Sequence, residues 1–301
     1  MKNETRTLRV RANGLEFEVL EQGTGDRLAL LLHGFPETAL CWRHQMPLLA
    51  RLGYRVWAPN QRGYGTSSRP GRVADYDIRH LVADAAGLAA ASGAARTLLV
   101  GHDWGGVVAW WAAAERALEL EALAILNMPH PDRYRAALKR PSQALKAWYV
   151  GAFQLPLLPD RLLAARGGRM VERAVLGTCR RPGAFPADVL ADYRRNSASP
   201  GGATAMLAWY RAATRGRLLA RAAALPRIGV PTLVVWGEAD AALDAAGLDG
   251  TERHVADLTV RRLPGVSHWV QEEAPEAVNA ELAGFLASRG LVTAPAPGAP
   301  G

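Results

Sequence analysis

The chain has 301 residues, of which 49% are hydrophobic and 21% charged, and its formal net charge is +8. This composition excludes wholesale disorder, and no apolar run approaches the roughly 18 residues that a membrane-spanning helix requires. The basic residues are not grouped in runs of five or more, so we expect no nucleic-acid partner and no membrane partner. The first ten residues lack the apolar segment of a secretory signal, which favours a cytoplasmic location. Cys41 and Cys179 are too few for a disulfide framework, and we expect free thiols in a reducing compartment.

Short apolar runs alternate with longer helical stretches, a pattern typical of βαβ units and a parallel sheet. Asn13-Gly14 predicts a hairpin of two antiparallel edge strands over residues 8–11 and 15–20. Continuous apolar runs predict six buried strands, at residues 28–32, 54–58, 97–100, 120–126, 232–236 and 258–262. Helices are predicted over residues 39–51, 77–91, 105–117 and 275–288.

Residues 132–225 interrupt this alternation, because they contain no clear strand and many Pro, Gly, Arg and Trp residues. They predict a helical insertion between two strands, and insertions at such places commonly act as lids. We therefore expect a core of residues 1–131 and 226–290, a helical lid over 132–225, and a disordered tail over 291–301, which is rich in Ala, Pro and Gly.

The predicted strand at 97–100 runs into Gly-His-Asp-Trp-Gly-Gly, which has the spacing of a nucleophile elbow. Such a turn is sharp, so it needs glycines, and it lifts the central side chain above the sheet. The backbone N–H of Trp104 would help to hold an oxyanion there. Because Asp103 occupies the centre in place of serine, the nucleophile suits an sp³ carbon, as in an epoxide or an alkyl halide. A plain helix cap is the alternative interpretation of Asp103.

Partners for this nucleophile follow other predicted strands. His33-Gly34 ends one strand and makes the N–H of Phe35 the second candidate oxyanion donor. Asp240 follows the strand at 232–236, where an acid would orient an imidazole, and Asp244 is its competitor. His268 follows the last strand and has the near-neutral pKa of a general base, although many histidines only cap or fill a core.

With these motifs the sequence resembles the α/β-hydrolase fold and, within it, the soluble epoxide hydrolases, over about residues 5–290. The motifs that carry the resemblance are HGFPE at 33–37, RGYGTSS at 62–68, GHDWGG at 101–106, WGEAD at 236–240 and SHW at 267–269. The resemblance implies a mostly parallel eight-stranded sheet flanked by helices, with an inserted all-helical lid. It implies a small hydrophobic epoxide and water as partners and no metal or organic cofactor, and it leaves a homodimer open.

The same family places two tyrosines in its lid. Tyr149 matches the one that lies four residues before a Phe-Gln pair, and Tyr210 matches the one in a Trp-Tyr-Arg motif. Opening an epoxide creates an alkoxide, to which a phenol can donate a hydrogen bond or a proton. Both tyrosines are therefore expected to hold the epoxide oxygen, although either could be an ordinary packing residue. Tyr134 and Tyr193 lack these neighbours and rank lower.

Three further residues have supporting roles by resemblance. Glu37 stands where relatives hold the hydrolytic water, and the alternative is a solvated loop glutamate. His102 stands beside the nucleophile, and His33 stands in the oxyanion loop. His102 could also be purely structural.

Other functions remain open at this point. A haloalkane dehalogenase would use the same aspartate and hold the halide with Trp104 and a second tryptophan, for which Trp148 is the nearest candidate. A fluoroacetate dehalogenase is disfavoured, because Trp104 and Val107 stand where its carboxylate-binding arginines would be. A small-molecule receptor without catalysis is the third alternative, since fold alone never proves activity.

Overall fold

The computed structural model describes residues 4–181 and 183–292, and the rest of the predicted tail lies outside them. Eight strands form one sheet in the order β1-β2-β4-β3-β5-β6-β7-β8. Their bounds are β1 Arg6–Ala12, β2 Leu15–Gln22, β3 Arg27–Leu32, β4 Tyr54–Pro59, β5 Thr97–His102, β6 Leu120–Leu126, β7 Thr232–Gly237 and β8 Leu258–Leu263. β2 is antiparallel to β1 and β4, and the other pairs are parallel. The predicted mostly parallel eight-stranded sheet is therefore confirmed.

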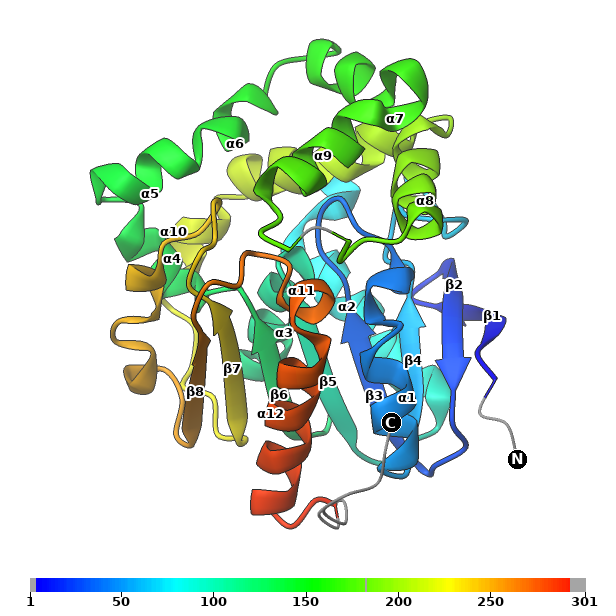
Figure 1. Ribbon diagram of the computed structural model, residues 1–301, viewed down its shortest axis with the longest axis vertical. Coiled ribbons are helices and arrows are strands. Elements are labelled where there is room, and N and C mark those ends of the chain that lie inside the picture. The colour runs from blue at the N-terminus through cyan, green and yellow to red at the C-terminus, as the bar shows by residue number, and fades with distance from the viewer. Residues whose placement is uncertain (1–3, 182, 293–301) are drawn as a thin grey trace.

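The central strands are buried along their whole length, which explains their continuous apolar sequences. Every residue of β5 and β7 is buried, as is expected of strands that are covered on both faces. The hairpin forms as predicted, but only β1 lies at an edge, because β2 also pairs with β4. Figure 1 shows helices on both sides of the sheet, and the parallel strands point toward one end of the molecule.

The helices of the core are α1 Gln45–Arg51, α2 Ile78–Ser92, α3 Trp104–Ala114, α11 Val270–Glu273 and α12 Pro275–Ser288. Short 3-10 helices are η1 Ala39–Trp42, η2 Val73–Tyr76, η3 Ala245–Leu248 and η4 Thr251–Arg253. α2 begins after Asp77, whose side chain accepts a hydrogen bond from the N–H of Arg79, and it ends at Gly93 in the left-handed region.

Two predicted helices are shorter than expected. The helix predicted over 39–51 is divided into η1 and α1. Pro47 explains the division, because it has no N–H with which to bond the carbonyl of Arg43 and so belongs in a first turn. α3 ends at Ala114 and not at residue 117, because Arg116 turns into the left-handed region with φ 53°.

The described residues of the insertion between β6 and β7 form helices that turns and short loops connect. Its helices are α4 Pro131–Ala137, α5 Pro141–Lys146, α6 Trp148–Ala152, α7 Leu158–Thr178, α8 Ala187–Ala198, α9 Gly202–Arg215 and α10 Leu218–Ala222. α7 is kinked, with non-helical backbone from Ala165 to Gly168. In Figure 1 the insertion covers the end of the sheet to which the parallel strands point.

Two smaller points complete the fold. Cys41 is buried and Cys179 is partly buried, and both thiols are free, as predicted. Among the described residues, none of the helices combines the length and the apolar composition that crossing a membrane would take.

Candidate active site

Asp103 stands at a strained turn between β5 and α3. Its backbone has φ 49° and ψ −120°, a conformation that residues with a side chain seldom adopt. The turn is tight enough that a Cβ on Gly105 would lie 2.0 Å from the carbonyl oxygen of Leu32. The glycine therefore permits the close approach that the nucleophile elbow requires.

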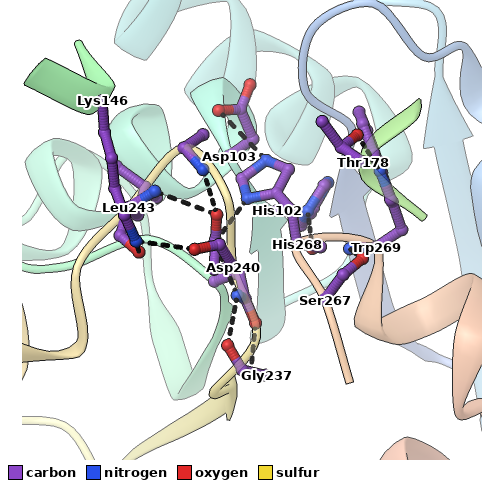
Figure 2. Close-up of polar contacts among 12 residues, drawn as sticks. His102, Asp103, Lys146, Thr178, Gly237, Asp240, Leu243, Ser267, His268 and Trp269 are labelled. Atoms are coloured by element: carbon purple, nitrogen blue, oxygen red, sulfur yellow. Dashed lines mark hydrogen bonds and ion pairs between the residues drawn. The ribbon is translucent and has the colours of Figure 1, made fainter. Parts of the chain in front are cut away.

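His268 and Asp240 meet Asp103 at this end of the sheet (Figure 2). His268 Nδ1 lies 2.7 Å from Asp240 Oδ2, and its Nε2 lies 3.6 Å from Asp103 Oδ2. The carboxylate of Asp240 thus fixes the proton on Nδ1 and leaves Nε2 directed at Asp103. The structure brings together the three residues that the sequence nominated for a triad.

The loop that carries Asp240 is fastened from two sides. Asn127 Nδ2 donates to Asp240 Oδ2 at 2.8 Å, and the backbone N–H groups of Ala242 and Leu243 donate to Oδ1. From the insertion, Lys146 Nζ donates to the carbonyl oxygen of Asp240 at 2.7 Å (Figure 2). These contacts hold the carboxylate in one orientation.

Asp244, the alternative acid, has other partners. Its carboxylate accepts from Ser142 Oγ at 2.8 Å and from the backbone N–H of Ala246 at 2.9 Å. It caps η3 and makes no contact with His268. The geometry therefore favours Asp240, as the order of residues after β7 did.

Burial and charge set the protonation states of the triad. Burial alone would raise the pKa of Asp103, but the hydrogen bond and charge of His268 hold it below its usual range. Burial lowers the pKa of His268, and the charges of Asp240 and Asp103 outweigh it and raise that pKa well above its usual value. Each of these shifts stabilises the charged form of its own group, because the imidazole ring lies between two carboxylates.

The candidate oxyanion donors flank Asp103. The backbone N–H of Phe35 donates to Asp103 Oδ1 at 2.8 Å. Trp104 is the first residue of α3, so its backbone N–H belongs to the first turn, where helix N–H groups have no intrahelical acceptor. The two carboxylate oxygens are thus distinguished, because Oδ1 accepts from the N–H of Phe35 and Oδ2 faces His268.

A second polar cluster supports His268 from behind. His102 Nε2 donates to the carbonyl oxygen of His268 at 2.9 Å, and its Nδ1 lies 2.7 Å from Glu37 Oε2. Glu37 is fully buried and also accepts from Gln271 Nε2 at 2.8 Å. The interpretation of Glu37 as a solvated loop residue is therefore wrong. That it holds a water stays a prediction.

His33 has a structural position in the oxyanion loop. Burial lowers its pKa to about 4, so the ring is neutral. Its Nδ1 donates to the carbonyl oxygen of Gly34, and its Nε2 accepts from the N–H of Gln61 at 3.1 Å. Both bonds fix the loop that presents Phe35.

A cavity of about 500 Å³ opens above Asp103, between the core and the insertion. Tyr149 and Tyr210 both line it, with ring centroids 6.0 Å apart. Burial raises the pKa of both phenols well above 10, so each carries its proton at neutral pH and can donate it. The remaining lining is mostly apolar, and among the residues that the structure describes Arg217 is the one cation that lines it.

The other aromatic candidates differ in whether they line the cavity. Tyr134 also lines the cavity, so the structure does not support ranking it with Tyr193. Tyr193 is fully buried elsewhere, with its hydroxyl 3.3 Å from Glu272 Oε1. Trp148 is 71% exposed and does not line the cavity, so its assignment as a halide-holding residue is wrong.

Arg211 is a residue of the Trp-Tyr-Arg motif to which sequence reasoning gave no role. Its guanidinium makes two bonds to Asp160, at 3.0 and 2.6 Å, and donates to the carbonyl oxygens of Phe153 and Leu155. It therefore joins α9, which carries Tyr210, to the end of α6, which carries Tyr149. An arginine next to Tyr210 was visible in the sequence. Its bidentate pair with Asp160 was not, because Asp160 lies 51 residues before it.

We expect Arg211→Ala to destabilise the insertion strongly. The change leaves the mostly buried carboxylate of Asp160 unpaired, at a cost of about 3–5 kcal/mol in the free energy of unfolding. Arg215→Ala is the matched control, because Arg215 lies one turn further along α9 and is exposed, and its cost should stay within about 0.5 kcal/mol. Chemical denaturation of both variants measures the difference. Equal stability would contradict this role for Arg211.

Comparisons with known proteins agree with this geometry. The family model of the α/β-hydrolase fold matches residues 30–275. The chain is 36% identical to an AB hydrolase superfamily protein of Bacillus subtilis, over 92% of this chain and 96% of that protein. It is 35% identical to epoxide hydrolase A of Mycobacterium tuberculosis, again over 92% and 96%. The crystal structure of epoxide hydrolase A from Mycobacterium thermoresistibile superposes with a TM-score of 0.83 at 34% identity, over 94% of this chain and 98% of that one.

Proposed function

Because the chain belongs to the α/β-hydrolase fold family and, within it, to the epoxide hydrolases, we propose that it converts a hydrophobic epoxide to a vicinal diol through a covalent ester on Asp103. One observation carries the proposal: a carboxylate occupies the nucleophile turn, beneath an apolar cavity that two phenols line. A carboxylate attacks an sp³ carbon readily, and the ester that results must then be hydrolysed.

In the first step Asp103 Oδ2 attacks one epoxide carbon. The C–O bond of the ring breaks, and its electron pair stays on the oxygen as an alkoxide. Tyr149 and Tyr210 donate hydrogen bonds to that oxygen, and one of the phenols gives it a proton. Oδ1 remains on the N–H of Phe35 and becomes the carbonyl oxygen of the ester.

In the second step water attacks the carbonyl carbon of Asp103. His268 Nε2 takes a proton from the water, and Asp240 stabilises the imidazolium that forms. The negative charge that develops on Oδ1 is stabilised by the N–H groups of Phe35 and Trp104. The ester C–O bond then breaks, and the leaving diol oxygen takes the proton that His268 holds. The second proton of the water passes to the tyrosinate left by the first step, so the carboxylate of Asp103 and both phenols are restored.

The remaining residues support these steps. Glu37 and His102 hold the backbone of His268, and His33 holds the oxyanion loop. The insertion acts as a lid that excludes water from the alkylation step. Its apolar lining favours a substrate whose epoxide-bearing part is uncharged. The protein works without a metal or an organic cofactor, since a carboxylate, an imidazole and two phenols supply every group that the reaction needs.

The origin of the diol oxygen tests the two-step route. In a single turnover of styrene oxide with excess enzyme in H₂¹⁸O, we expect ¹⁸O in Asp103 and none in the diol. The reason is that water adds to the carboxyl carbon, so the diol takes its new oxygen from Asp103. Peptide mapping and mass analysis of the diol measure both. A labelled diol in the first turnover would mean direct attack of water on the epoxide.

A parallel exposure to a bromoalkane tests the other two functions. Turnover of the bromoalkane without turnover of the epoxide would indicate a dehalogenase. That function has lost one of its two candidate halide donors, because Trp148 lies outside the cavity lining. Binding of both compounds with consumption of neither would indicate a receptor.

The pKa shifts predict that acid pH slows the second step selectively. Asp103, whose pKa is lowered, stays ionised and still attacks in acid. His268 must be neutral to accept a proton, so hydrolysis slows about tenfold for each pH unit below its pKa in the ester form. That pKa lies below the resting one, because esterification removes the negative charge of Asp103, one of the groups that raise it. Intact mass after acid quench should show more ester at pH 5 than at pH 8, and equal amounts would contradict the scheme.

A further inference from the structure

The outer side of the insertion exposes apolar side chains to solvent. All eight large hydrophobic residues that are strongly exposed in the described structure lie between residues 145 and 176: Leu145, Trp148, Leu155, Leu157, Leu158, Leu162, Met170 and Leu176. Leu145 is 75% exposed and Trp148 71%. Single exposed apolar side chains are common, but a group of them indicates an interaction site. In Figure 1 the helices that carry them, α5 to α7, belong to the insertion, and the end of α7 returns to the core, where Thr178 Oγ1 accepts a hydrogen bond from Trp269 Nε1 at 3.0 Å. We call this set of residues the outer face.

The charge of the insertion is strongly positive. Residues 131–225 contain 17 of the 36 Lys and Arg residues but only 5 of the 28 Asp and Glu residues. Two of these five, Asp160 and Glu172, lie on α7 between residues of the outer face, and both are already paired, with Arg211 and Arg194. The charges that the outer face leaves unpaired are therefore basic.

The basic and apolar side chains lie on the same side of α7. Arg169, Arg173 and Leu176 follow one another at helical spacing and are exposed, and Val171 and Val175 on the opposite side are fully buried. In the first part of α7, Leu158 and Leu162 share one stripe, with the exposed Arg161 beside them. Among the described residues, none of these three arginines forms an ion pair.

We propose that the outer face docks on an anionic lipid surface. Exposed Leu and Trp side chains interleaved with arginines are the composition of segments that lie in the interface of a membrane. A second copy of this chain fits poorly, because a two-fold contact would set the unpaired arginines against each other. An acidic protein would satisfy the charges but leaves the density of exposed leucines unexplained.

The position of the cavity adds to this argument. The exposed residues that line its mouth include Ala144 on α5 and Arg217 before α10. Leu145 and Trp148 of the outer face follow Ala144 directly in the chain. Docking would therefore bring the mouth close to the lipid phase, where apolar compounds concentrate. The sequence interpretation expected no membrane partner because the arginines are scattered along the chain, whereas α7 alone exposes Arg161, Arg169 and Arg173.

Vesicle co-sedimentation tests the proposal without any use of epoxide turnover. At 0.1 M salt we expect the wild-type chain to sediment with vesicles of phosphatidylcholine and phosphatidylglycerol (7:3) and to remain in solution with phosphatidylcholine alone. Raising the salt to 0.5 M should release it, because the surface charge is then screened. A difference spectrum between the wild type and Trp148→Phe should show a blue-shifted emission on the anionic vesicles.

Two triple variants separate the outer face from the net charge. Replacing Arg161, Arg169 and Arg173 by Gln should weaken partitioning about a hundredfold. The matched control replaces Arg11, Arg51 and Arg96 by Gln, which removes the same charge from exposed positions on the core and should change partitioning less than fivefold. Both variants should hydrolyse styrene oxide like the wild type, which shows that they fold.

Several results would overturn the proposal. They are equal losses in the two triple variants, equal sedimentation with both kinds of vesicle, or no sedimentation at all. Retention on immobilised polyglutamate without vesicle binding would assign the outer face to an acidic protein. A stable dimer that shields Trp148 from iodide quenching would assign it to a second copy.

Discussion

His268→Gln is expected to take up one equivalent of styrene oxide per chain and to release almost no diol. Alkylation needs the ionised Asp103 and the two phenols, and the substitution leaves the phenols in place. It removes the hydrogen bond and charge that lower the pKa of Asp103, so we expect alkylation to be complete at pH 8, where the carboxyl is ionised even with a raised pKa. Hydrolysis of the ester needs a base at the position of Nε2, which lies 3.6 Å from Asp103 Oδ2, and a glutamine amide is not a base. We expect steady-state turnover to fall about 10⁴-fold and intact mass to rise by the whole epoxide, located on Asp103.

Three variants control this experiment. Asp103→Ala should form no adduct, and Asp240→Asn should slow hydrolysis strongly, because the acid that orients His268 is lost. Asp244→Asn is the matched control for the latter, since its side chain can still accept from the N–H of Ala246 and it makes no contact with His268. Steady diol production by His268→Gln would contradict the base role. An adduct on another residue would contradict the role of Asp103.

The central strands were predictable because they are buried on both faces. The strand predicted as buried over 258–262 is β8, which lies at the edge of the sheet and is partly exposed. In a parallel sheet that is covered on both sides, alternation disappears and a continuous apolar run remains, as in β3, β5 and β7. The helix predicted over 39–51 failed for a local reason: a proline interrupts the hydrogen bonds of an otherwise suitable stretch. Such breaks depend on single backbone donors, which a periodic pattern does not register.

The nucleophile turn could be predicted because its physical requirements are local. A strand, a strained residue and glycines at fixed spacing are all contained in the ten residues 97–106. The acid and the base could be proposed only from their order after later strands. What separates Asp240 from Asp244 is the distance to His268, which the sequence does not contain.

The sequence did not predict which side chains of the insertion point into the cavity. Tyr134 and Trp148 are both aromatic residues on short helices, yet one lines the cavity and the other faces solvent. Asn127, which holds Asp240, lies 113 residues before it, so only the adjacency of β6 and β7 brings them together. Long-range pairs of this kind leave no local signal.

The double variant Tyr149→Phe/Tyr210→Phe should fail at the opposite step from His268→Gln. The alkoxide develops as the ring opens, so loss of both donors slows ester formation and no adduct accumulates. Removing one such donor costs about 10²–10³-fold in rate, and we expect about 10²-fold for each single variant and at least about 10⁴-fold for the double. Rapid-quench measurement of the ester on Asp103 separates this step from hydrolysis.

Tyr134→Phe is the control within the same cavity, and we expect its rate to change less than tenfold. A loss equal to that of Tyr149→Phe would make Tyr134 a third donor to the alkoxide.

A further test changes the substrate, because electron-withdrawing groups on the epoxide stabilise the alkoxide without help from the protein. The loss in the double variant should then shrink as the leaving alkoxide becomes less basic. A loss that is independent of the leaving group would mean that the phenols only shape the cavity, and the assignment of Tyr149 and Tyr210 as proton donors would be wrong.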